Sequence, residues 1–140
     1  MNLKVEVIEK RLSEVLPARP EVICVYLFGS FLTMPEEARD IDLALLLEPG
    51  QDTATAFMRL YPLVADVFTP REVDLVFLRQ ASLSLRFAVI STGRVVYCRD
   101  EERRTGFEDI TVRDYLDFKY HLEAAQQELF TAIQEGYRFA

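Results

Sequence analysis

Three short apolar runs are the feature that most constrains how this chain can fold. They lie at residues 22–28, 40–47 and 72–78, and the first ends at Gly29 while the second is closed by Pro49-Gly50. Short apolar runs closed by turn residues are typical of strands buried in a sheet, and the first run is also rich in β-branched and aromatic residues. A fourth apolar run follows Gly93, at residues 95–98. The chain is therefore expected to build its core around a sheet.

Apolar residues at helical spacing occupy the segments between these runs and flank them at both ends. They predict helices over residues 3–16, 53–68 and 83–90, with Asp52 or Thr53 and then Ser82 as N-terminal caps. Residues 31–39 are expected to form a loop or a short helical turn. The resulting order predicts an α/β (α+β) fold, a small mixed sheet flanked by helices. The length of 140 residues fits a single domain spanning residues 1–140.

The C-terminal third is expected to be one long amphipathic helix. Its apolar residues recur at spacings of three and four: Tyr115, Phe118, Leu122, Ala125, Leu129 and Ile133. This stripe is expected to face the core, with His121, the only histidine, on the helix surface. A second apolar edge, formed by Tyr120, Phe130 and Tyr137, would let the helix pack on a partner.

Charge and composition narrow the function classes. The net charge of −7 disfavours direct nucleic-acid binding, which requires a basic surface, and favours a basic protein partner. Continuous apolar segments of membrane-spanning length are missing from the sequence, and charges interrupt the N-terminus where a signal peptide would be apolar. We therefore expect a soluble, cytoplasmic protein. The two cysteines, Cys24 and Cys98, are expected to be buried and reduced.

Asp40 and Asp42 are the first candidate site residues. They lie two positions apart at the start of a predicted strand, so both carboxylates project from the same face. Two acids at one place repel each other, and a hard divalent cation such as Mg²⁺ would relieve that repulsion. The alternative is that both side chains lie at an exposed strand start and face water.

Gly29-Ser30 and Asp74 complete the candidate site. A strand that ends in Gly-Ser can direct backbone N–H groups and a hydroxyl toward a phosphate, although an ordinary turn would have the same sequence. Asp74 lies among apolar residues of the third predicted strand and would join Asp40 and Asp42 if the two strands are neighbours. Arg39 either reaches a phosphate or is a surface arginine.

The arrangement of these residues resembles the signature of the polymerase-beta-like nucleotidyltransferase superfamily. The resemblance rests on Gly29-Ser30 after apolar Leu27-Phe28, a spacer of nine residues, Asp40-Ile41-Asp42-Leu43, and the later Val73-Asp74-Leu75. The short chain resembles the minimal nucleotidyltransferases, which lack added substrate domains. Tail segments extend the likeness to the MntA-type antitoxins of HEPN/MNT toxin–antitoxin modules: Leu85-Arg86, residues 93–97, Phe107 and residues 115–119.

The resemblance implies a reaction and a set of roles. An antitoxin of this type would transfer AMP from ATP to a tyrosine of a partner HEPN ribonuclease, with two Mg²⁺ ions, and so silence it. Gly29 and Ser30 would contact the nucleotide phosphates. Asp40 and Asp42 would bind both metal ions, and Asp74 would bind one and accept the proton. Such a protein is expected to form hetero-oligomers or homo-oligomers.

Two other functions remain open from the sequence. One is an adenylyltransferase that modifies a small-molecule hydroxyl. The other is a catalytically weak module that neutralises its partner by binding alone. The loop at residues 31–39 favours the second, because it lacks the basic residue and the glycine that many relatives carry there, and Arg39 replaces a small residue before Asp40.

Overall fold

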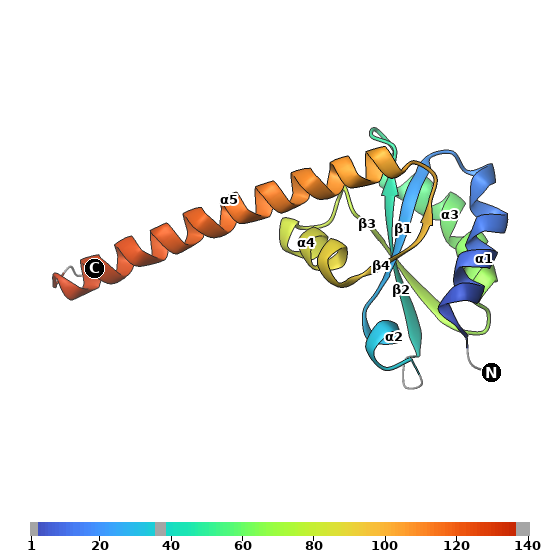
Figure 1. The fold of residues 1–140 in the computed structure, drawn as a ribbon, viewed down its shortest axis with the longest axis horizontal. Helices are drawn as coiled ribbons and strands as arrows, with labels where there is room; N and C mark the ends of the chain where they lie inside the picture. Colours follow the sequence, from blue (N-terminus) through green and yellow to red (C-terminus); the bar gives the residue numbers. More distant parts are fainter. Residues whose placement is uncertain (1–2, 36–38, 137–140) are drawn as a thin grey trace.

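The computed structural model describes residues 3–35 and 39–136 and contains a four-stranded mixed sheet with helices on both faces (Figure 1). The strands are β1 (Val22–Phe28), β2 (Asp40–Leu47), β3 (Glu72–Phe77) and β4 (Arg94–Cys98). The helices are α1 (Val5–Val15), α2 (Ser30–Thr33), α3 (Thr53–Phe68), α4 (Leu83–Thr92) and α5 (Glu101–Gln134), with a 3-10 turn, η1 (Leu16–Ala18), after α1. The predicted α/β fold is confirmed. The predicted bounds of β1, β2 and α3 coincide with the observed ones, and the bounds of α1, β3, α4 and β4 differ from the prediction by one or two residues.

The sheet has the order β3-β2-β1-β4. β1 is antiparallel to both β2 and β4, whereas β2 and β3 are parallel and joined through α3. Because β1 ends where β2 and β3 begin, Gly29, Asp40 and Glu72 lie at the same end of the sheet. The connection through α3 therefore brings residues that are far apart in the sequence to the same end of the sheet.

Each face of the sheet has its own apolar core. α1 and α3 cover one face, where Leu12 and Leu60 pack against Leu27, Ile41 and other buried strand residues. α4 and the first turns of α5 cover part of the other face, around Tyr26, Ala44 and Val89. Alternation along β1 and β2 explains the division, because successive side chains of a strand point to opposite faces.

Capping residues explain where three helices begin. The Asp52 carboxylate accepts a hydrogen bond from the Thr55 backbone N–H at 3.0 Å, and Ser82 Oγ accepts one from the Leu85 N–H at 3.2 Å. Asp100 caps α5 in the same way, through the Arg103 N–H. These side chains satisfy N–H groups that have no partner within the helix. The predicted cap Ser82 is confirmed, and of the two alternatives Asp52 and Thr53 it is Asp52 that caps α3.

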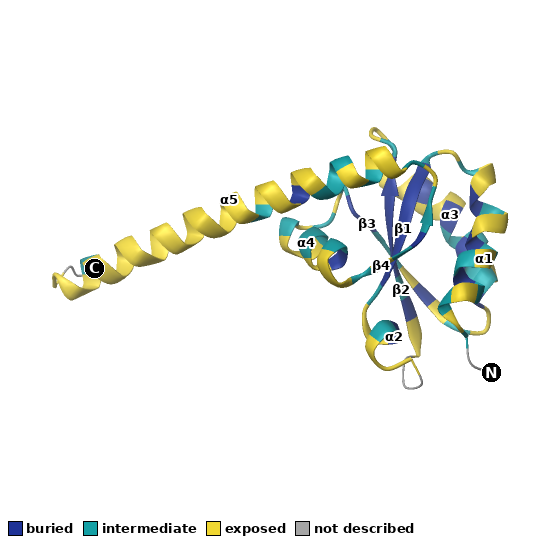
Figure 2. Cartoon of the chain, viewed as in Figure 1, coloured by how far each residue is buried: buried dark blue, intermediate teal, exposed yellow. Residues whose placement is uncertain are grey.

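The outcome for α5 differs from the prediction. The helix begins at Glu101, and only its first part packs on the sheet and α4. Beyond it α5 extends away from the rest of the protein as an exposed rod (Figure 2). Leu122, expected to face the core, is 45% exposed, and Phe118, Leu129 and Ile133 are exposed as well. The predicted core-facing stripe is therefore wrong for this part of the helix, because the core ends before the helix does.

Two further expectations concern the cysteines and the membrane. Cys24 and Cys98 are free thiols that lie opposite each other on β1 and β4, with Cys24 buried and Cys98 half-buried. Within residues 3–35 and 39–136, every helix is too short or too polar to cross a membrane.

Candidate active site

Gly29 marks the end of β1 and adopts a conformation that only glycine takes readily. Its φ of 80° and ψ of −158° lie outside the regions available to residues with a side chain. A Cβ atom at this position would lie 2.3 Å from Oδ2 of Asp42. The missing side chain thus lets the backbone of the β1–α2 turn lie directly against the Asp42 carboxylate.

Asp42 and Asp74 are direct neighbours on the parallel strands β2 and β3. Residues in register on adjacent strands project from the same face of the sheet. Asp40 lies two positions before Asp42 on that face and is in register with Glu72. The structure therefore brings Asp40, Asp42 and Asp74 to one patch of one face, as the sequence predicted if the two strands were neighbours.

The face that carries these acids is the one that α4 and α5 cover elsewhere. Asp42 alternates with Ile41 and Leu43, which are buried under α1 and α3. Further along the same face the strands carry Ala44 and Tyr26, which belong to the second core. At the aspartates this cover ends, so Asp42 is half-buried while Asp40 and Asp74 are exposed. The patch is open to a ligand from solvent.

The surroundings of Asp42 favour its protonated form. Burial, followed by the negative charges of Asp74 and Asp40 and a side-chain hydrogen bond with Asp74, raises the pKa of Asp42. Two adjacent carboxylates can relieve their repulsion by sharing a proton, and a bound cation relieves it in the same way. The charge arrangement at Asp42 is therefore suited to a cation.

The chemistry of these donors fits a hard divalent cation. Asp40, Asp42 and Asp74 offer only carboxylate oxygens, the ligands that Mg²⁺ prefers, and the missing side chain of Gly29 leaves room for the Asp42 carboxylate beside the turn. Among the described residues, however, no three His, Cys, Asp or Glu side chains are already arranged to hold a metal ion. Binding of a metal ion by all three aspartates would thus require at least one of these side chains to move.

Ser30 and Arg39 lie at the same end of the sheet as the aspartates. Ser30 is the first residue of α2, next to Gly29, and its side chain is exposed. Arg39 is exposed and directly precedes β2. Residues 36–38 of the intervening segment lie outside the described part of the chain. Their predicted contacts with phosphate therefore stay a prediction.

Two arginines, Arg71 and Arg94, lie at the same end of the sheet as the aspartates but on its opposite face. The sequence did not identify them as candidate site residues. Arg71, just before β3, lies over the ring of Phe31 with its guanidinium carbon 5.6 Å from the ring centroid. Arg94, the first residue of β4, forms an ion pair with Glu9 at 3.1 Å. Both line a cavity of about 420 Å³ beside Phe31 and the start of α1. Phe31 packs in the core under α1 and α3, so this cavity is separate from the aspartate face.

An apolar groove runs along β3, the edge strand that carries Asp74. It has a volume of about 690 Å³ and is lined by Phe57 and Met58 of α3, Leu85 of α4 and residues 75–77 of β3. Val76, two positions after Asp74, projects from the same face as the aspartates. The groove was not predicted, because its walls come from three elements that are distant in sequence.

Comparison with known protein families identifies one that matches this chain. Residues 10–102, which include Gly29, Asp40, Asp42 and Asp74, match the family described as Polymerase beta, Nucleotidyltransferase. Curated protein sequences gave no significant match.

Several solved structures are similar over nearly the whole chain. One is a complex of a tri-AMPylated Shewanella oneidensis HEPN toxin with an MNT antitoxin, 25% identical, with a TM-score of 0.64 over 94% of this chain and 99% of the other. A second is a toxin–antitoxin with AMP-PNP, 26% identical, with a TM-score of 0.65 over 90% of this chain and 98% of the other. A third, a toxin–antitoxin MntA complex with two aspartate-to-glutamate substitutions, is 25% identical with a TM-score of 0.63, over 94% of this chain and 99% of the other. The match over more than half of its length shows that the chain belongs to the polymerase beta nucleotidyltransferase family.

Proposed function

We propose that this protein is an MNT-type antitoxin that transfers AMP from ATP to a tyrosine of a HEPN toxin and thereby neutralises it. The observation that carries the proposal is the register of Asp42 and Asp74 on adjacent parallel strands, with the side-chain-free Gly29 against Asp42. A pair of acids beside a close-approaching backbone is the arrangement that nucleotidyl transfer needs. The similarity to an antitoxin crystallised with a tri-AMPylated HEPN toxin supports the choice of acceptor.

Each residue of the patch has a role in the proposed reaction. Asp40 and Asp42 would hold two Mg²⁺ ions, with Asp74 as a further ligand of one; such ions would neutralise phosphate charge and align the reacting oxygens. The N–H groups at Gly29 and Ser30, the Ser30 hydroxyl and Arg39 would bind the phosphates. These contacts would hold the α-phosphate over the aspartate face, because Gly29 borders Asp42.

The transfer step is a displacement at the α-phosphorus. The tyrosine oxygen forms a bond to that phosphorus while the bond to the β-phosphate oxygen breaks, and pyrophosphate leaves. Asp74 accepts the phenolic proton, since its side chain is exposed and it lies next to Asp42 on the edge strand β3. The groove beside β3 supports an aromatic acceptor, because its apolar walls begin two positions beyond Asp74 on the same face.

Mass spectrometry of a reconstituted reaction tests the proposal. The protein is mixed with ATP, Mg²⁺ and the HEPN protein encoded beside its gene, and the HEPN protein is expected to gain AMP units on a tyrosine. Asp42→Asn is the control variant, because it keeps the shape of the side chain and removes the charge that binds the cation. We expect at least a 100-fold loss of transfer, in line with the effect of removing one electrostatic group from an active site.

The outcomes separate the competing functions. AMP on a small hydroxyl compound in the absence of any protein acceptor would instead identify a small-molecule adenylyltransferase. Neutralisation of the HEPN protein by Asp42→Asn as effective as by the wild type would identify a binding module. If the HEPN protein gains no mass with all components present, the proposed transfer is wrong.

A further inference from the structure

The outer part of α5 carries apolar side chains that no other element of the described chain covers. Thr111 is its last buried residue, and Tyr115 stacks on Phe87 of α4 with ring centroids 3.9 Å apart. From Leu116 onward every described residue of the helix except the half-buried Ala132 is exposed. Residues 116–134 extend roughly 28 Å at about 1.5 Å per residue, which Figure 2 shows as a bare rod beyond α4.

The apolar residues of this rod continue the face by which α5 packs on its own sheet. Glu108, Thr111 and Tyr115 follow one another at spacings of three and four and contact Tyr26, the core and α4. Spacings of three and four continue with five residues that we call the α5 stripe: Phe118, Leu122, Ala125, Leu129 and Ile133. The four large side chains of the α5 stripe are 45–56% exposed. A stripe with this repeat is the seam by which helices pack on each other.

We propose that the α5 stripe is the docking surface for the HEPN-type partner, through a helix of that partner whose apolar face is flanked by basic residues. The identity of the partner rests on the proposed function; the packing surface rests on the geometry of α5. α5 accounts for 34 of the 140 residues. The antitoxin crystallised with its HEPN toxin matches 94% of this chain, so most of α5 has a counterpart in a protein that assembles with such a toxin.

The charges beside the α5 stripe define the chemistry of the partner. From Leu116 to Gln134 the sequence carries Asp117, Glu123 and Glu128 but, among Lys and Arg, only Lys119. A basic partner would neutralise these carboxylates, whereas a second copy of this acidic chain, with a net charge of −7, would add to the repulsion. A ribonuclease has the required chemistry, because it must bind a polyanion.

The test measures association separately from transfer. In an Asp42→Asn background, the double variant Leu122→Glu/Leu129→Glu is compared with Gln127→Glu/Thr131→Glu, which adds the same charge on the opposite side of the helix. Binding to the HEPN protein encoded beside the gene is measured by titration calorimetry. We expect the Kd to rise at least 100-fold for the first pair, as for central interface residues, and to change less than about 3-fold for the second.

Every outcome decides the question. The unfolding temperature should be the same for both variants, since the rod makes no contact with the sheet, so a loss of folding cannot imitate a loss of binding. Equal Kd values for the two double variants would show that the α5 stripe is not the docking surface, and would leave the proposed AMP transfer unaffected. Binding through the α5 stripe by a wild-type protein that transfers no AMP would overturn the proposed function alone. A dimer of the isolated protein that Leu122→Glu/Leu129→Glu dissociates would assign the α5 stripe to a second copy instead.

Discussion

At the scale of single residues, Gly29 and Asp42 depend on each other. The turn after β1 can approach the Asp42 carboxylate only because residue 29 has no side chain. Burial, and then the charges of Asp74 and Asp40, raise the pKa of Asp42. Such an arrangement stores unfavourable interactions in the free protein that a bound cation would remove. The same two residues therefore connect stability with the proposed activity.

Gly29→Ala should abolish AMP transfer and destabilise the fold. The variant would force residue 29 into a strained backbone conformation, costing about 1–3 kcal/mol, and push Asp42 away from its position. Gly50→Ala is a matched control, because Gly50 also has a positive φ, of 84°, but has no atom within 4 Å of the added Cβ. Urea denaturation and transfer assays should show strain in both variants and loss of transfer only at Gly29. An active Gly29→Ala protein would show that close contact with Asp42 is not required.

Asp42→Asn should stabilise the metal-free protein at neutral pH by up to about 1 kcal/mol, a gain limited by solvent screening. The folded-state pKa of Asp42 is raised, so its ionisation disfavours the folded protein as the pH rises through that pKa. At about pH 3 the carboxyl is largely protonated in both states, so the two proteins should be almost equally stable. Thermal unfolding between pH 3 and pH 8 measures the difference, with Asp66→Asn, an exposed site on α3, as the control for charge. A stability gain that persists at pH 3 would contradict this assignment.

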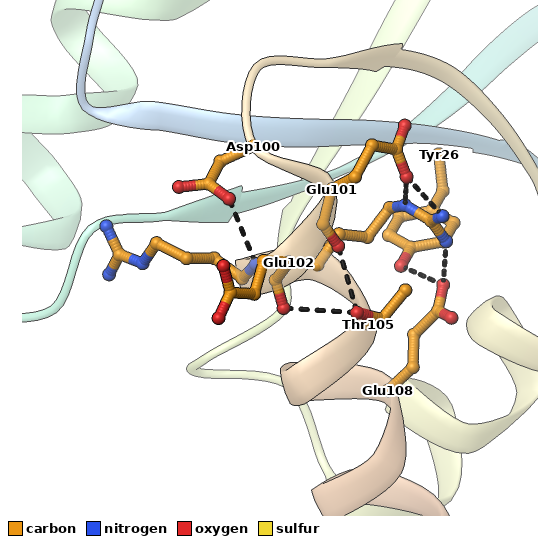
Figure 3. A network of polar contacts seen from close by, with 8 residues as sticks. Tyr26, Asp100, Glu101, Glu102, Thr105 and Glu108 are labelled. Carbon is orange, nitrogen blue, oxygen red and sulfur yellow. Dashed lines mark hydrogen bonds and ion pairs between the residues drawn. The ribbon is translucent and has the colours of Figure 1, made fainter.

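At the scale of elements, one polar network fastens α5 to the sheet. Tyr26 of β1 donates a hydrogen bond from its hydroxyl to Glu108 Oε1 at 2.6 Å, and Arg104 donates to the same oxygen at 2.7 Å. Arg104 also binds Glu101 (Figure 3). Nearby, Arg99 and Arg103 both pair with Glu48 at the end of β2. The first turns of α5 are thus bonded to β1 and to the end of β2, whereas its outer half makes no such contacts with the described residues.

Tyr26→Phe should weaken the attachment of α5. Tyr26 is 1% exposed, and the variant removes its partly buried hydrogen bond to the charged Glu108, at a cost of about 1.5 kcal/mol. Arg104 still pairs with Glu108, which prevents a larger loss. A double-mutant cycle with Glu108→Ala, followed by urea denaturation, isolates the coupling between the two side chains. Additive effects of the two substitutions would mean that the hydrogen bond contributes nothing to stability.

At the scale of the whole molecule, the protein consists of a tightly packed sheet and a helix that extends well beyond it (Figure 1). Helices pack on both faces of the sheet, whereas the outer part of α5 lacks tertiary contacts with the rest of the described chain and depends on its own hydrogen bonds. In proteins most of the stability of a helix comes from tertiary packing of its apolar face, which this segment lacks. The stability of the molecule is therefore unevenly distributed along α5.

Hydrogen exchange of the isolated protein should reveal this division. Amides of residues 116–134 are expected to exchange close to the rate of an unfolded chain, and those of residues 101–115 at least about 100-fold more slowly, because only the latter segment is packed. Mass spectrometry of peptic fragments measures both segments in one experiment. Uniform protection along α5 would show that the outer half is already covered in the isolated protein, by self-association.

The sequence by itself determined the strands, the helices and the residue types of the candidate site. Apolar runs and helical spacing act locally, so the four strands, the caps Asp52 and Ser82, and the position of the acids Asp40 and Asp42 on one face could all be predicted. Only the tertiary structure decided that β2 and β3 are adjacent and parallel, which places Asp74 beside Asp42. It also decided that the groove along β3 exists and that the core ends near Tyr115, so that the α5 stripe meets solvent. The physical reason is the same in each case: a periodic pattern specifies which side of an element is apolar, whereas the arrangement of the other elements determines what covers that side.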